Sequence, residues 1–245
     1  MVGIRSDVGI VRSLNEDYAG YIEEEGYKLY VVADGMGGHN AGEVASEMAV
    51  NSVEAYVKEN YKNDGSNVLE NAILFANEKI YDKARCGSEY KGMGTTLVAA
   101  LVYEDKIIIA NVGDSSCFGI NDSDIIKITK DHSLVQELVD SGSITEEEGR
   151  NHPQKNVITR ALGTNNVVNV DIFEINRNAY DKYLLCTDGL SNEVLKEEML
   201  REINNINDYN TACDKLVLLA KNRGGRDNIT VLLFGGEVQK WSVKY

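Results

Sequence analysis

The chain has 245 residues, of which 43% are hydrophobic and 26% are charged, proportions that are ordinary for a globular protein. Its 25 Lys and Arg residues stand against 39 Asp and Glu residues, which gives a formal net charge of −14. An acidic chain of this kind repels nucleic acid and anionic membrane surfaces, so neither is an expected partner. The four cysteines form no CxxC pair and the amino terminus has no apolar leader, which predicts a cytoplasmic protein without membrane insertion.

Apolar segments with strand-like or helical periodicity follow one another along the whole chain. No Pro-rich or Ser-rich linker interrupts them, and we therefore expect residues 1–245 to form one domain. In chain order, the predicted elements are strand Lys28–Ala33, helices Gly42–Lys62 and Ser66–Cys86, strands Thr95–Tyr103, Lys106–Val112, Ser116–Asn121, Asp124–Thr129, Val167–Ile175 and Lys182–Cys186, helices Glu193–Ile203 and Tyr209–Lys221, and strand Ile229–Phe234.

Several predicted strands are joined by very short turns. Glu104-Asp105 and the three residues from Asn121 to Ser123 are examples. Such turns can connect only antiparallel neighbours, because parallel strands need a long crossover. The pattern therefore favours an α+β fold in which antiparallel sheets are covered by pairs of helices.

Four aspartates stand at the ends of predicted strands. Asp34 and Asp188 each follow an apolar strand and precede a glycine, Asp114 lies at a hairpin, and Asp227 precedes the last strand. Converging carboxylates repel one another unless cations separate them, and oxygen ligands without nearby His or Cys favour Mg²⁺ or Mn²⁺ over zinc. Any one of these segments could instead be an ordinary Asp-Gly turn or a helix cap.

Taken together, six short motifs resemble the signature of one enzyme family, the metal-dependent or type-2C (PPM) protein phosphatases. The resemblance is to their stand-alone bacterial branch. The motifs are Arg12–Asp17 (RSLNED), Ala33–Gly38 (ADGMGG), Gly92–Thr96 (GMGTT), Val112–Ser115 (VGDS), Thr187–Gly189 (TDG) and Arg226–Thr230 (RDNIT).

The resemblance implies a four-layer αββα sandwich, with two antiparallel β-sheets flanked by helix pairs. It also implies a serine/threonine phosphatase in which a hydroxide bridging two Mn²⁺ or Mg²⁺ ions attacks the phosphate directly. Asp34 would bridge both ions, and the Gly35 carbonyl would bind one of them. Asp188 and Asp227 would hold the other, while Asp114 matches a possible third site.

Three further residues receive roles from the same resemblance. Arg12 would clamp the substrate phosphate, and Glu16 and Asp17 would orient metal-bound waters. Met36 stands where eukaryotic relatives place a histidine that is proposed to protonate the leaving group. That leaves two candidate acids, a water near Asp114 or the side chain of His39.

His132 and His152 match family positions, and we expect both to be structural and not catalytic. We expect Arg160 to brace local structure, and Ser133–Arg150 to form a flap beside the active site that influences substrate choice.

The resemblance implies phosphorylated proteins as partners, together with a cognate Ser/Thr kinase and a monomeric enzyme. One competing function is a catalytically weak binding module on the same fold, which would have lost metal carboxylates. The other is a phosphatase acting on a small phospho-molecule. The first is disfavoured because Asp34, Asp114, Asp188 and Asp227 are all present.

Overall fold

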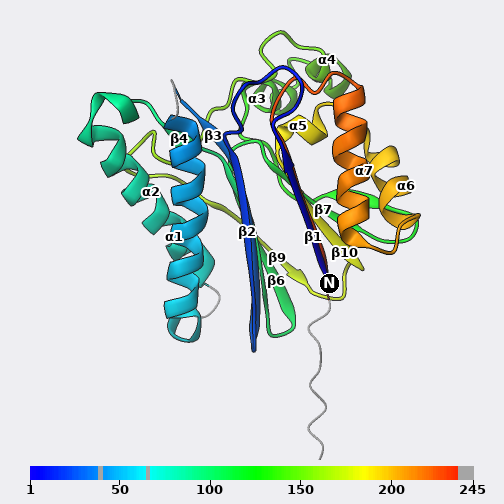
Figure 1. Cartoon of the computed structure of the whole chain (residues 1–245), viewed down its shortest axis with the longest axis horizontal. Coiled ribbons are helices and arrows are strands. Elements are labelled where there is room, and N and C mark those ends of the chain that lie inside the picture. Colours follow the sequence, from blue (N-terminus) through cyan, green and yellow to red (C-terminus); the bar gives the residue numbers. More distant parts are fainter. Residues whose placement is uncertain (38–40, 65–66, 237–245) are drawn as a thin grey trace, which may run out of the picture.

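The computed structural model describes residues 1–37, 41–64 and 67–236. Gly38, His39 and the first residue of the predicted helix Ser66–Cys86 lie outside these ranges. Two antiparallel sheets pack face to face and helices cover both outer surfaces (Figure 1). The predicted α+β sandwich of four layers is confirmed.

One sheet has the strand order β2-β3-β5-β6-β9, with the short β4 paired to β3. Its strands are β2 (Asp17–Glu24), β3 (Tyr27–Met36), β4 (Gly94–Thr95), β5 (Leu97–Tyr103), β6 (Lys106–Val112) and β9 (Asp171–Asn176). The other sheet has the order β1-β11-β10-β7-β8. It comprises β1 (Val2–Asp7), β7 (Ser116–Ile120), β8 (Ile125–Lys127), β10 (Lys182–Cys186) and β11 (Ile229–Gly235).

The helices lie on the outer faces or in the connections. α1 (Ala41–Asp64) and α2 (Val68–Cys86) cover the first sheet, and α6 (Lys196–Asn204) and α7 (Tyr209–Asn222) cover the second. The short helices are α3 (Leu134–Asp140), α4 (Glu146–Arg150), α5 (Asp188–Ser191) and a 3-10 turn at Ser88–Tyr90. Among the helices of the described ranges, none has the length and apolar character needed to cross a membrane.

The central strands are apolar throughout because both of their faces are covered. In β3, Tyr30 and Val32 point into the space between the sheets, whereas Leu29, Val31 and Ala33 point toward α1 and α2. Successive side chains of a strand alternate between the two faces, so a sheet covered on both sides needs an unbroken apolar run. A fully buried Val, Leu or Ile side chain contributes about 1.5–3 kcal/mol.

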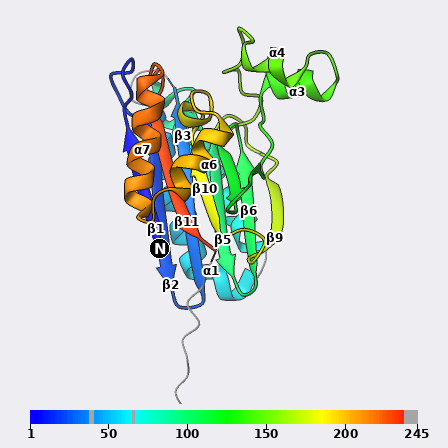
Figure 2. The ribbon, with the colours of Figure 1, turned by 90° about the vertical axis from the view of Figure 1, so that its right-hand side faces the viewer.

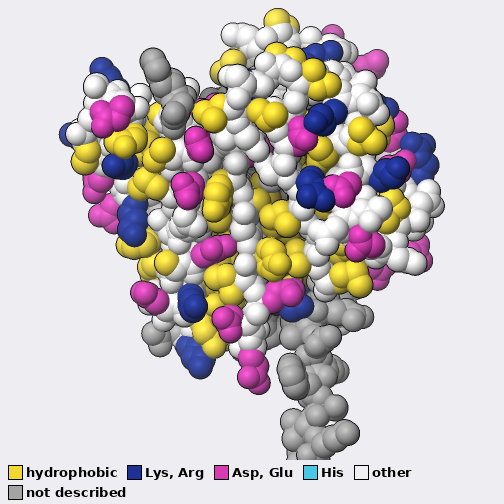
Figure 3. Space-filling view, viewed as in Figure 1, with side chains coloured by type: hydrophobic (Ala, Val, Ile, Leu, Met, Phe, Trp, Pro, Cys, Tyr) yellow, Lys and Arg dark blue, Asp and Glu magenta, His cyan; other side chains and the backbone are white. Residues whose placement is uncertain are grey.

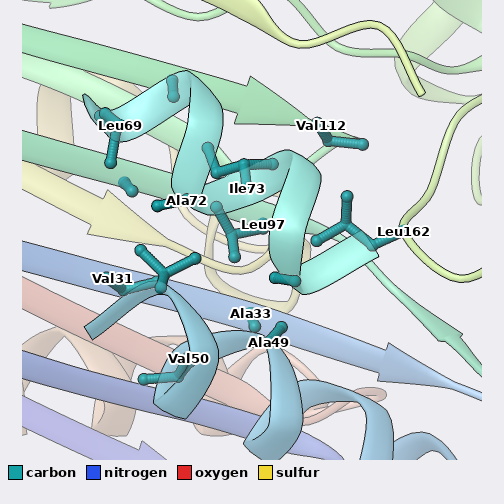
Figure 4. Close-up of a cluster of buried hydrophobic side chains, with 14 of the residues drawn as sticks. Val31, Ala33, Ala49, Val50, Leu69, Ala72, Ile73, Leu97, Val112 and Leu162 are labelled. Atoms are coloured by element: carbon teal, nitrogen blue, oxygen red, sulfur yellow. The ribbon is translucent and has the colours of Figure 1, made fainter. Parts of the chain in front are cut away.

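Figure 4 shows the layer between the first sheet and its helices. Ile73 of α2 and Val50 of α1 pack against Val31 and Leu97 from neighbouring strands. A corresponding cluster joins α6 and α7 to the second sheet. These two outer cores and the core between the sheets leave the strand ends as the places where polar side chains collect.

The two predicted hairpins, β5–β6 and β7–β8, are confirmed by their antiparallel pairing. The sequence analysis missed β1 and β2, each of which lies at one edge of its sheet and mixes apolar residues with exposed and polar ones. It placed the start of β9 too early, because Val167 is 74% exposed and precedes the strand. The helix predicted from Glu193 begins only at Lys196, after the short α5 and a cap at Leu195.

The segment between β8 and β9 leaves the sandwich and carries α3 and α4, which project from one end of the sheets (Figure 2). The Ser133 side chain caps α3 by accepting a hydrogen bond from the Gln136 amide. On the face shown in Figure 3, acidic and basic side chains are interspersed, and hydrophobic ones gather between β1 and β2.

Candidate active site and metal centre

A cavity of about 300 Å³ opens at the end of the sandwich where β3 and the start of β11 meet. Its wall brings together residues from segments far apart in sequence. Those that the sequence analysis singled out are Arg12, Glu16, Asp34, Gly35, Asp114, Asp188 and Asp227. Asp17, the remaining predicted residue, is buried behind this wall and is only 6% exposed.

Asp34 is fixed through its backbone near the end of β3. Its amide donates to Thr96 Oγ1 at 3.1 Å, and its carbonyl accepts from the Thr96 amide at 2.9 Å. The Thr95 hydroxyl donates to the same carbonyl at 2.8 Å. The Gly-Met-Gly-Thr-Thr motif therefore sets the position from which the Asp34 carboxylate enters the cavity.

Gly35 sits where two other backbone segments come very close. A Cβ at this position would lie 2.1 Å from the Gly42 carbonyl oxygen and 2.5 Å from that of Glu16. The Gly35 amide donates to the Glu16 carbonyl at 3.0 Å, and Ser46 Oγ donates to the same oxygen at 2.6 Å. Only glycine fits here, and this packing holds Glu16 against the Asp34 strand end.

Asp188 is the first residue of α5, which is separated by one residue from the end of β10, a strand of the second sheet. The preceding Thr187 accepts from the Thr230 amide at 3.0 Å and donates from Oγ1 to Asp17 Oδ2 at 2.9 Å. Asn192, one helical turn on, donates to Asp188 Oδ2 at 2.9 Å. One Asp188 oxygen is thus held by the helix, and the other remains available to the cavity.

Asp227 and Asn228 join the two ends of the chain. Arg12 Nη2 donates to Asp227 Oδ2 at 2.9 Å, across 215 residues of sequence. The Asn228 side chain accepts from the Glu16 amide at 2.8 Å and donates to the Leu14 carbonyl at 2.9 Å. These bonds shape the loop that carries Arg12 and Glu16 around the cavity.

Burial and repulsion from neighbouring carboxylates raise the pKa values of Asp17, Asp34, Asp114 and Asp188. Burial is the largest cause for Asp34 and Asp114, whose pKa values lie well above the ordinary range, and neighbouring carboxylates add to it. Burial raises the pKa of Asp188 to about 6, with the Asp227 charge contributing. It raises the pKa of Asp17 to about 7. A bound cation would offset the repulsion between these closely spaced negative charges.

Three buried carboxylate oxygens fit a cation and its water shell. Within the described ranges, Glu16 Oε1, Asp17 Oδ1 and Asp188 Oδ1 have no hydrogen-bond donor. Buried acceptors without partners are costly, so a ligand of positive or donor character is expected. The available donors to a metal are oxygens, which is the set that Mg²⁺ and Mn²⁺ prefer.

The carboxylates do not form a closed cage. Among the residues that the structure describes, no group of three or more His, Cys, Asp or Glu side chains surrounds one point closely enough to hold an ion alone. Carboxylates around an open cavity fit ions that keep several waters, as Mg²⁺ does.

Five cavity residues were not assigned a role in the sequence analysis: Gly37, Thr96, Asn156, Ile158 and Asn228. Thr96 and Asn228 lie inside quoted motifs, where a polar residue beside a strand-end Asp was the available signal. Asn156 and Ile158 come from the returning part of the flap, and no local pattern marks them. Met36 also lines the cavity and carries no ionisable group.

Comparisons with known proteins place these motifs in a family context. The family model of protein phosphatase 2C matches residues 11–221. The serine/threonine phosphatase stp of Listeria monocytogenes serovar 1/2a is 41% identical over 234 residues, which cover 94% of this chain and 93% of the relative. PstP of Mycobacterium tuberculosis (strain H37Rv) is 38% identical over 231 residues, 94% of this chain and 43% of that longer protein.

Solved structures agree with the sequence relatives. The serine/threonine phosphatase Stp1 from Staphylococcus aureus superimposes with a TM-score of 0.90 at 39% identity, covering 97% of this chain and 95% of the other. The catalytic domain of PstP in complex with two manganese ions gives a TM-score of 0.85 at 35% identity, with 95% and 96% coverage.

Proposed function

The chain belongs to the protein phosphatase 2C family, and we propose that the cavity at the end of its sandwich is the active site. The protein is a metal-dependent serine/threonine phosphatase that hydrolyses phosphoserine and phosphothreonine in proteins, with Mn²⁺ or Mg²⁺ as cofactor. The observation that carries the assignment of the site is the convergence of Asp34, Asp114, Asp188 and Asp227 with Arg12 on one cavity.

Asp34, Asp188 and Asp227, with the Gly35 carbonyl, are the ligands that would hold the two core ions. Asp114, with Asp188, would serve a third ion. The raised pKa values of Asp34 and Asp188 support this proposal, because each reports a buried carboxyl that lacks a compensating charge. When bound, the ions lower the pKa of coordinated water and offset the charge of a phosphate.

Arg12 is the group that binds the phosphate of the substrate. Arg12 lines the cavity, and its guanidinium is anchored at 2.9 Å to Asp227 through Nη2. A planar guanidinium with five donors can bind two phosphate oxygens at once, which the single ammonium of lysine does less well. Arg12 therefore orients the phosphoester next to the carboxylates.

Glu16 and Asp17 orient water near the carboxylates. Glu16 Oε1 and Asp17 Oδ1 are buried and accept no hydrogen bond from the described residues, while the Thr187 hydroxyl fixes the second oxygen of Asp17. A buried acceptor held in this way can receive a proton from a water molecule and set its direction.

The proposal extends to organisation and partners. Residues 1–245 act as one catalytic domain, which the shared core between the sheets supports, and the enzyme acts as a monomer. Its substrates are formed by a Ser/Thr kinase, whose action the enzyme reverses. A cytoplasmic location is in keeping with the free cysteines, of which Cys117, Cys186 and Cys213 are buried.

A substrate panel tests the function. After removal of metal by chelation, the purified chain should be inactive on phosphothreonine and phosphoserine peptides, and Mn²⁺ or Mg²⁺ should restore turnover. A phosphotyrosine peptide and small phosphate esters of metabolite size serve as comparisons. Full activity in the chelator, or activity confined to the small esters, would contradict the proposal.

Substitution of Arg12 tests the phosphate clamp. Arg12→Ala should raise KM for the phosphopeptide by about ten- to a hundredfold, since a hydrogen bond to a charged group contributes roughly 1.5–3 kcal/mol. Arg12→Lys should recover part of this loss. Arg85→Ala, which changes an exposed residue of α2, is the matched control. An unchanged KM in Arg12→Ala would remove Arg12 from the site.

A further inference from the structure

His132 lies just behind the cavity wall, between β8 and α3, and is only 8% exposed. Its ring has neighbours on both nitrogens. The Gly113 amide donates to Nδ1 at 2.9 Å, and Nε2 lies 3.1 Å from Asp171 Oδ2. Since Gly113 immediately precedes Asp114, this buried ring contacts the backbone one residue before one of the cavity carboxylates.

These contacts define the tautomer of His132. A backbone amide can only donate, so Nδ1 must be the acceptor nitrogen and the ring proton must be on Nε2, directed at Asp171. Burial lowers the pKa of His132, which favours this neutral form. Arg160 Nη1 is 2.9 Å from Nε2, but it donates to Asp171 Oδ1 at 2.6 Å and to the Asn169 carbonyl at 3.2 Å.

The Gly113 turn is confined from several sides. Its φ of +109° belongs to the region that favours glycine, and a Cβ there would lie 2.6 Å from the Thr96 Cβ. The Gly113 carbonyl accepts from the His132 amide at 2.9 Å and from Asn111 Nδ2 at 3.1 Å. His132 therefore binds both the amide of Gly113, through its ring, and the carbonyl, through its backbone.

The same residue also contacts the base of the flap. The His132 carbonyl accepts from the Thr159 amide at 2.8 Å. Ser133, the next residue, forms a β-bridge with Ile158, which lines the cavity. Leu134, the first residue of α3, donates to the Val157 carbonyl at 2.9 Å. His132 thus lies where the Asp114 turn meets the outgoing and returning segments at the base of the flap.

We infer that His132 is a positioning residue, which holds Asp114 in register with the flap side of the cavity by accepting the Gly113 amide hydrogen bond. The inference rests on the proposed function for the role of Asp114 in catalysis. If the ring only filled space, any side chain of similar size could replace it. A positioning ring acts through its Nδ1 acceptor, and that difference can be measured.

The three substitutions that separate these contacts are His132→Asn, His132→Gln and His132→Ala. An asparagine amide oxygen falls near the place of Nδ1 and can accept from Gly113, whereas a glutamine amide reaches the place of Nε2. In metal-free protein, the Gly113 amide should exchange with solvent at the wild-type rate in His132→Asn and at least tenfold faster in His132→Ala and His132→Gln. The ¹⁵N shifts of the wild-type ring should report protonation at Nε2.

Kinetics then test the path through Asp114. His132→Ala should lower kcat on a phosphothreonine peptide by roughly ten- to a hundredfold, as small misplacements in active sites do, and His132→Asn should recover most of it. In an Asp114→Ala background, His132→Ala should cause no more than about a twofold further loss, because residues acting as one unit are not additive. Thermal melts identify any variant that fails to fold.

The outcomes separate the two proposals. No metal-stimulated phosphatase activity in the wild-type chain would overturn the proposed function. Unchanged Gly113 exchange in His132→Ala, a His132→Asn variant that behaves like alanine in a folded protein, or losses that multiply with Asp114→Ala would each overturn the positioning role of His132.

Discussion

The ends of β3 and β10 share a sequence pattern and differ in structure. Each strand is a buried apolar run followed by Asp-Gly. Asp34 and Gly35 remain inside β3, whose last residues pair with β4, whereas Asp188 and Gly189 leave β10 and begin α5. The two aspartates come from opposite sheets and reach the same cavity.

The two Asp-Gly pairs need glycine for the same reason. A Cβ on Gly35 would lie 2.1 Å from the Gly42 carbonyl oxygen, and a Cβ on Gly189 would lie 1.9 Å from that of Asn228. In both places another backbone segment crosses directly against the strand end. The Asp-Gly pairs therefore arise from close backbone packing around the cavity, and their resemblance to ordinary turn dipeptides is superficial.

The largest effects should come from the aspartates themselves. Asp34→Asn and Asp188→Asn should each lower kcat by about a thousandfold or more, because each removes a ligand charge worth several kcal/mol in the transition state. Asp34→Asn should be the more severe, since Asp34 is proposed to contact both ions. Asp122→Asn, in the exposed β7–β8 turn, is the matched control. Near-normal kcat at saturating Mn²⁺ would show that the substituted aspartate is not a ligand.

Alanine at the glycines tests whether packing is their common requirement. Gly35→Ala and Gly189→Ala should each destabilise the fold by about 1–3 kcal/mol or more, the usual cost of overpacking. Each kcal/mol corresponds to about 2–4 °C in Tm for a chain of this size. Gly235→Ala is the control, because its nearest contact would be an ordinary 3.5 Å. Equal melting temperatures for all three variants would refute the packing argument.

The smallest expected effect is the pH dependence of the melting temperature of the metal-free protein. Burial raises the pKa of Asp188 to about 6 and that of Asp34 well above its ordinary range. A group with a raised folded-state pKa contributes stability that is complete below its unfolded pKa, near 4, and is lost as pH rises through the folded value. The metal-free Tm should therefore fall between pH 5 and pH 8.

Asparagine variants sharpen this prediction. Asp34→Asn and Asp188→Asn should both melt a few degrees above the wild type at pH 8 in chelator, because each removes a buried charge. Both should gain less from Mn²⁺ than the wild type, which binds metal in its deprotonated form and is stabilised by it. A wild-type Tm that rises from pH 5 to pH 8 without metal would contradict the expected direction of this pH dependence.

Much of the fold and the site could be predicted from local signals. The central strands are buried on both faces, so their apolar runs are unambiguous, and the strand-end aspartates stand out against them. The edge strands β1 and β2 were missed because one face of each is half exposed and carries polar residues such as Arg5 and Glu23. Asn156 and Ile158 reach the cavity only through the return of the flap, a long-range arrangement that no short pattern encodes.

The pairing of β1 with β11 has a consequence for biosynthesis. Arg12 leaves the ribosome 215 residues before Asp227, which holds it, and Glu16 leaves 212 residues before Asn228, which holds it. Contacts of such long range form late and slowly, since loop closure must precede them. A nascent chain that lacks β11 has no complete cavity. Catalytic competence therefore arises only once β11 has been translated, so a nascent chain that ends before β11 cannot act on phosphoproteins beside the ribosome.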